Sequence, residues 1–97
     1  MIRHLCLIRY KDPASVTPQM QQRIEQAYLS LPGLIPGILS MQVGRDRGLL
    51  EGNADLAIQA TFEDEEAFRR YSVHPAHGEV IFPVLGAHML DYSTAQF

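Results

Sequence analysis

Apolar and polar residues alternate at the start of the chain, which predicts a β-strand over residues 2–10. The even-numbered positions lie on one face of this strand and the odd-numbered positions on the other. Neither set is wholly polar, so we expect both faces to be covered over most of the strand. The strand ends at Lys11-Asp12-Pro13, because proline has no N–H group to donate to a neighbouring strand.

A change to helical spacing follows. Thr17 is a suitable N-cap, and Pro18 suits the first helical position. The apolar side chains then recur every three or four residues, at Met20, Ile24, Tyr28 and Leu31. This pattern predicts an amphipathic helix that ends at Pro32-Gly33.

Two further strands are predicted in the middle of the chain. Residues 38–43 form the first, and residues 54–62 alternate in the same way. Between them, residues 45–53 are charged and contain Gly48 and Gly52, so they form an exposed connection. A short polar connection between two strands indicates an antiparallel pair.

The last third of the chain predicts two helices and a strand. Acidic residues 63–66 suit a helix start, and the apolar residues Ala67, Phe68 and Tyr71 follow. The residue before a proline is pushed out of the α region, so His74-Pro75 interrupts this helix. A further helix is expected over 76–85, and a last strand over 88–92 or, in a longer form, up to residue 97.

The order of elements is that of a ferredoxin-like βαββαβ fold, an α+β fold, in a single domain over residues 1–97. Its helices cover one face of a four-stranded sheet. We expect the other face to carry His4, Cys6, Ile8, Met41, Leu56, Ile58, Ala60 and Met89. Such an apolar face is not left in water, so the sequence predicts a homodimer whose sheets pack face to face as a dimeric α/β barrel.

Composition narrows the possible partners and the location. The net charge is −3 and the basic residues are scattered, which argues against nucleic acid as a partner. No apolar run approaches the ~20 residues of a membrane span. The single cysteine, Cys6, lies in an apolar strand, and no secretion signal is evident, so we expect a reducing, cytoplasmic location.

The densest group of chemically active side chains is Tyr71-x-x-His74-Pro75-x-His77. A buried neutral imidazole suits a general base, and His77 is the best candidate. His74 before a proline is more simply a helix cap. His4 is equally an interior histidine or a pocket residue, and Tyr28 and Tyr71 are core residues unless their hydroxyls meet a cavity.

A metal site is a weaker alternative. His74, His77 and a carboxylate such as Glu79 are the candidate ligands, but a third ligand at recognisable spacing is missing. Cys6 has no helix N-terminus beside it that would favour a thiolate, so it is a poor nucleophile. No metal and no cofactor are therefore expected.

Several segments together resemble the stress-responsive dimeric α/β-barrel family. They are the His4 strand, residues 32–37, residues 55–62 and, above all, Tyr71-x-x-His74-Pro75-x-His77. The resemblance runs from residue 2 to about residue 92. It implies that His77 is a general base and that Tyr71 orients it or the substrate. It also implies that His4 and Tyr28 line the same small apolar cavity.

The hypothesis from the sequence is a cofactor-independent enzyme that acts on a small apolar carbonyl compound, polyketide-like or aromatic. Removal of a proton next to the carbonyl would begin a cyclase, isomerase or lyase reaction. We expect apolar side chains to complete the substrate pocket, namely Cys6, Ile8, Met41, Leu56, Ile58, Val84 and Met89. The alternatives are a non-catalytic, stress-associated dimer that binds an apolar ligand, and a structural dimer with a filled interior.

Overall fold

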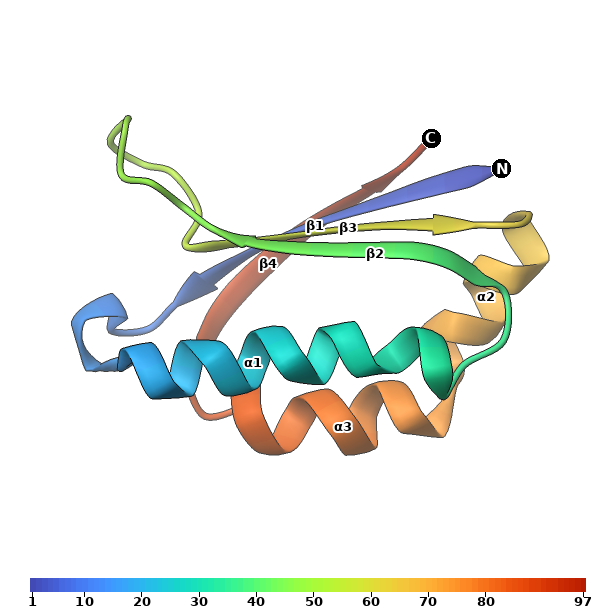
Figure 1. Ribbon diagram of the computed structural model, residues 1–97. Helices are drawn as coiled ribbons and strands as arrows, with labels where there is room; N and C mark the ends of the chain where they lie inside the picture. Colours follow the sequence, from blue (N-terminus) through green and yellow to red (C-terminus); the bar gives the residue numbers. More distant parts are fainter.

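Four strands form one antiparallel sheet in the computed structural model, which describes residues 1–97 (Figure 1). Their order across the sheet is β2-β3-β1-β4. The strands are β1 (Ile2–Tyr10), β2 (Ile38–Arg45), β3 (Leu56–Phe62) and β4 (Met89–Gln96). The predicted βαββαβ order is confirmed, with the second helical segment split in two.

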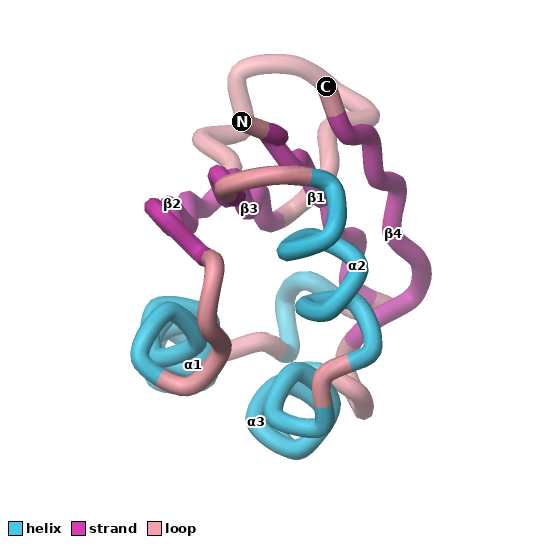
Figure 2. Tube along the Cα trace, turned by 90° about the vertical axis from the view of Figure 1, so that its right-hand side faces the viewer, coloured by secondary structure: helices cyan, strands magenta, loops and turns pink.

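All helices lie on one side of the sheet, and Figure 2 shows α1 under β2 and β3, with α2 and α3 toward β1 and β4. They are α1 (Pro18–Ser30), α2 (Glu65–Val73) and α3 (Pro75–Leu85), and short 3-10 turns occupy Pro13–Ser15 and Leu31–Gly33. An N-cap residue explains where α1 begins. Thr17 accepts a hydrogen bond from the Met20 N–H at 3.2 Å, as its position predicted.

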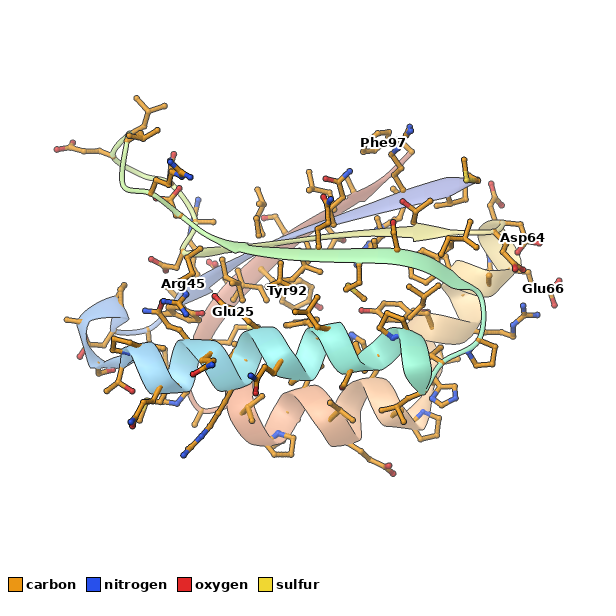
Figure 3. The ribbon with its side chains drawn as sticks, in the orientation of Figure 1. Glu25, Arg45, Asp64, Glu66, Tyr92 and Phe97 are labelled. Atoms are coloured by element: carbon orange, nitrogen blue, oxygen red, sulfur yellow. The ribbon has the colours of Figure 1, made fainter.

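Strand ends differ from the prediction by a few residues. β2 extends to Arg45, whose guanidinium pairs with Glu25 of α1 (Figure 3). β3 begins at Leu56, and the carboxylate of the preceding Asp55 accepts a hydrogen bond from the Tyr10 N–H at 2.8 Å. β4 takes the longer of its two predicted forms.

The core lies between the sheet and the helices. From β1 and β3 it contains the even-numbered positions, whose register places Cys6 opposite Ile58 and Ile8 opposite Leu56. From α1 it contains Ile24 and Tyr28. Phe62 is fully buried where β3 approaches α2. Burial of these apolar side chains supplies most of the stabilisation of a domain of this size.

The predicted assignment of the two sheet faces is wrong. The set expected to face a second copy faces the helices instead, since Ile8, Leu56, Ile58 and Ala60 are all buried within a single chain. Period-two alternation divides a strand into two sets but does not say which set meets the helices. Both sets contain apolar residues here, so the pattern alone left the choice open.

The face turned away from the helices is mixed in character. Leu5 and Leu7 of β1 lie at its centre between small and polar neighbours, among them Ala57, Gln59, Ser93 and Ala95. The connection between β2 and β3 rises on this same side of the sheet (Figure 1). Its tip exposes Leu49 and Leu50 by 79% and 73%. This surface, not the predicted one, is the unpartnered face of the sheet.

Candidate active site

A cavity of about 380 Å³ lies between the sheet and the helices. Its walls come from β1 and β4 above and from α2 and α3 below, and one side chain of α1, Tyr28, reaches it. The polar lining groups are His4, Tyr28, Tyr71, Ser72, His77, Tyr92, Thr94 and Gln96. The apolar lining includes Cys6, Ile8, Phe68, Ile81, Leu85 and Met89.

The break between α2 and α3 positions His77. His74 ends α2 in an extended conformation, and its Nδ1 accepts a hydrogen bond from the Ala76 N–H at 3.0 Å. The prediction that His74 is a cap is confirmed. Because a new helix starts there, His77 falls in the first turn of α3 and its ring meets that of Tyr71.

The contact between His77 and Tyr71 is a packing contact. Their ring centroids are 4.8 Å apart at an interplanar angle of 77°, which is an edge-to-face arrangement. No hydrogen bond joins the two side chains. The imidazole nitrogens of His77 are therefore not occupied by Tyr71.

Burial sets the protonation state of His77. Desolvation disfavours the charged imidazolium and lowers the pKa of His77 below its ordinary value of 6.5. The His77 side chain makes no hydrogen bond, yet no buried side-chain nitrogen or oxygen of the chain is without a partner. The ring nitrogens must therefore remain accessible, and a neutral imidazole is presented at the cavity.

The hydroxyls of Tyr28 and Tyr71 are also free. Both residues are buried, neither hydroxyl bonds to a protein group, and neither is an orphaned buried atom. Both oxygens therefore reach the cavity. Burial raises the pKa of each tyrosine well above its usual range, so each keeps its proton and acts as a hydrogen-bond donor.

His4 completes the polar group from β1. Its Nδ1 lies 2.9 Å from Nε2 of Gln96 on β4, and its ring packs 4.9 Å from that of Phe68. Desolvation lowers the pKa of His4, and a charge on His77 lowers it further. His4 is thus an interior histidine that also lines the cavity.

Cys6 lines the cavity without being reactive. Burial raises the pKa of its thiol to about 11, so it is not a thiolate at neutral pH. It acts as a small apolar wall residue beside Ile8.

Four of the predicted substrate-binding residues do not line the cavity: Met41, Leu56, Ile58 and Val84. Leu56 and Ile58 are fully packed in the core, and the other two are half-buried against it. The reason is lateral position in the sheet. The cavity lies over β1 and β4, whereas Met41 belongs to β2, and Leu56 and Ile58 belong to β3.

Of the cavity wall formed by β4, only Met89 was identified from the sequence. Tyr92, Thr94 and Gln96 pair with Ile8, Cys6 and His4, so they share the cavity face of the sheet. Figure 3 shows Tyr92 on the helix side of the sheet. The register between the two terminal strands is the signal that would have found them, and it depends on an irregularity at Arg9 and Tyr10.

The candidate metal ligands named above do not form a cluster. No three side chains of His, Cys, Asp or Glu come together in a way that would hold a metal ion. Of the weaker alternative set, His74 already uses Nδ1 in its cap. No helix is long and apolar enough to cross a membrane.

Known proteins share both the sequence pattern and the fold. The stress responsive A/B barrel domain model matches residues 2–93. Olivetolic acid cyclase from Cannabis sativa is 28% identical over 79 residues, which are 78% of this chain and 75% of that protein. The stress-response A/B barrel domain-containing protein HS1 from Arabidopsis thaliana is 30% identical over 89 residues, 89% of this chain and 79% of that protein.

A solved structure matches over nearly the full length. It is a dimeric ferredoxin-like protein of unknown function from Thermobifida fusca, with a TM-score of 0.82 and 34% identity. The match covers 99% of this chain and 88% of that one. The similar proteins therefore include one named as an enzyme and one without a known activity.

Proposed function

The chain belongs to the stress-responsive A/B barrel domain family, and we propose that it is a cofactor-independent enzyme that acts on a small apolar carbonyl compound. One observation carries the proposal. A neutral imidazole, that of His77, and two unpaired tyrosine hydroxyls meet in one cavity whose other walls are mostly apolar. A base beside hydrogen-bond donors is the equipment for removing a proton next to a carbonyl.

In the proposed step, His77 takes a proton from the carbon next to the carbonyl. The bond electrons form the carbon–carbon double bond of an enolate, and negative charge develops on the carbonyl oxygen. The hydroxyl of Tyr71 donates a hydrogen bond to that oxygen, and Tyr28 is the second hydroxyl in the cavity. Apolar walls that exclude water strengthen these interactions.

The size and lining of the cavity favour an uncharged, polyketide-like or aromatic substrate. No Lys, Arg, Asp or Glu lines it, so a charged group would find no counter-ion there. The similarity to olivetolic acid cyclase supports the same substrate class. Cyclase, isomerase and lyase reactions all begin with the proposed proton transfer.

The test needs no knowledge of the complete reaction. A panel of aromatic and polyketide-like ketones is incubated with the protein in D₂O, and NMR follows exchange of the protons next to each carbonyl. Exchange that depends on His77 supports the enzyme. Binding of the same compounds without any exchange would contradict it and favour the non-catalytic ligand-binding dimer.

The pH profile of the exchange rate is the first prediction. The base must be neutral, and the pKa of His77 is lowered by burial. The rate constant is therefore expected to be constant near neutral pH and to fall only as the pH drops through a value below 6.5. A profile that still rises with pH above 7 would contradict His77 as the base.

Replacing Tyr71 with phenylalanine tests the hydroxyl separately from the ring. We expect kcat to fall by about 10²-fold, the effect of one lost oxyanion donor. The melting temperature is expected to stay close to that of the unaltered protein, because the hydroxyl has no protein partner. Tyr10→Phe is the matched control, since Tyr10 is buried but lies outside the cavity. Equal activity of both variants would exclude this role of Tyr71.

We also propose that the working form is a homodimer assembled through the outer sheet face. The similar Thermobifida fusca protein is described as dimeric. In this chain, Leu5 and Leu7 lie on that face, and the leucine-tipped connection rises beside it. A hollow of about 430 Å³ between this face and the connection is lined by Leu7, Leu49 and Ala57.

The proposed location is a reducing compartment such as the cytoplasm, where Cys6 would remain a free thiol.

A further inference from the structure

The ring of His4 is held from the last strand of the sheet. Nε2 of Gln96 lies 2.9 Å from Nδ1 of His4, and the two residues are cross-strand partners. Next to them, Arg3 and Phe97 exchange two backbone hydrogen bonds of 2.7 and 2.9 Å. The backbone therefore fixes both Cα positions, and the Gln96 amide is already placed against the imidazole.

This contact favours one of the two neutral forms of His4. An amide NH₂ group only donates, so this placement favours Nδ1 of His4 as the acceptor and the ring proton on Nε2. Nε2 of His4 makes no hydrogen bond within the protein. Because no fully buried side-chain nitrogen of the chain lacks a partner, Nε2 is accessible. Because His4 is buried and lines the cavity, its N–H group is directed to the space that a ligand would fill.

The surroundings keep His4 uncharged. Its ring lies among those of Phe62, Phe68 and Tyr71, with centroids 6.4, 4.9 and 6.0 Å away. Burial lowers the pKa of His4, and a positive charge on His77 lowers it further. The two histidines that line one cavity are thus unequal: once His77 holds a proton, His4 stays neutral.

We propose that Gln96 is a positioning residue that fixes His4 with its proton on Nε2, and that this N–H group donates a hydrogen bond to the carbonyl oxygen of the substrate. The donor role rests on the proposed function. When His77 takes the proton from carbon, charge moves onto that oxygen, and the hydrogen bond from His4 strengthens without transfer of its proton. A neutral imidazole can stabilise a developing enolate in this way.

NMR of the ring nitrogens tests the positioning directly and needs no substrate. In the unaltered protein, Nε2 of His4 is expected to carry the proton. In Gln96→Glu, a carboxylate that only accepts replaces the donor, so the proton is expected on Nδ1. Gln96→Leu should give a mixture of both forms. Gln26→Leu, the same change at an exposed position of α1, should leave the His4 signals unchanged.

The exchange assay then tests the donor role. Gln96→Glu is expected to lower kcat by about 10²-fold, as for a lost oxyanion donor, and Gln96→Leu by less. A merely structural role of Gln96 predicts the opposite ranking, because leucine removes the hydrogen bond altogether. Gln96 is exposed at the strand end, so neither variant should unfold.

The outcomes of the two experiments distinguish the positioning role of Gln96 from the donor role of His4. A proton on Nδ1 in the unaltered protein, or a tautomer that ignores the Gln96 variants, overturns the positioning while leaving the role of His77 intact. Variants that shift the tautomer without slowing exchange overturn the donor role alone. An unaltered protein that exchanges no compound of the panel overturns the donor role together with the proposed function, but not the positioning.

Discussion

Alanine in place of His77 is expected to lower the rate of proton exchange by about 10²- to 10⁴-fold, the usual contribution of a general base. The reason is geometric as well as chemical. His77 is the histidine that combines a lowered pKa, a free side chain and a place in the cavity wall. The measurement is the exchange rate constant at pH 7.5, where the unaltered His77 is neutral.

Folding of the His77→Ala variant should be unaffected, because the side chain donates and accepts no hydrogen bond within the protein and is only half-buried. Circular dichroism and sedimentation check that point. The matched control is His74→Ala, three residues away. That change removes the cap of α3 and is expected to cost about 1 kcal/mol of unfolding free energy while keeping activity. An inactive His74→Ala variant together with an active His77→Ala variant would show that the base is His74 and not His77.

Leu7→Lys is expected to dissociate the proposed homodimer without unfolding the chain. Leu7 is 39% exposed in the single chain and lies on the face turned away from the helices. A lysine there stays in water in the monomer but would be buried without a partner in a packed pair of sheets. Analytical ultracentrifugation at micromolar concentration measures the outcome, and a dimer that tolerates the lysine would exclude this face.

Ile58→Lys is the control that distinguishes the two faces. Ile58 is 1% exposed within one chain, so a lysine there meets the core and not a second copy. An unpaired charge in a core costs about 3–5 kcal/mol, which is a large share of the stability of a domain this size. The variant is expected to unfold. A folded monomeric Ile58→Lys would return the dimer interface to the face first predicted.

Much of the local structure followed from the sequence because its causes are local. Thr17 followed by Pro18 starts α1 through a hydrogen bond between residues three apart. The break at His74-Pro75 has a steric cause within two residues, and the cap that His74 provides spans only two more. The strands followed from alternation. The group of His4, Tyr28, Tyr71 and His77 was expected in one cavity from resemblance, and the geometry assembles it.

What only the tertiary structure decided depends on distant parts of the chain. The alternation of apolar and polar residues placed Ile58 and Gln59 on opposite faces of β3. The packing of the helices then decided which of the two is buried. The pairing of Gln96 with His4 joins residues 92 positions apart and follows from strand register. The cavity is the volume that β1, β4, α2 and α3 leave unfilled. A residue's own neighbours in sequence do not set that volume, so Met41 and Val84 were misplaced beside it and Thr94 was overlooked.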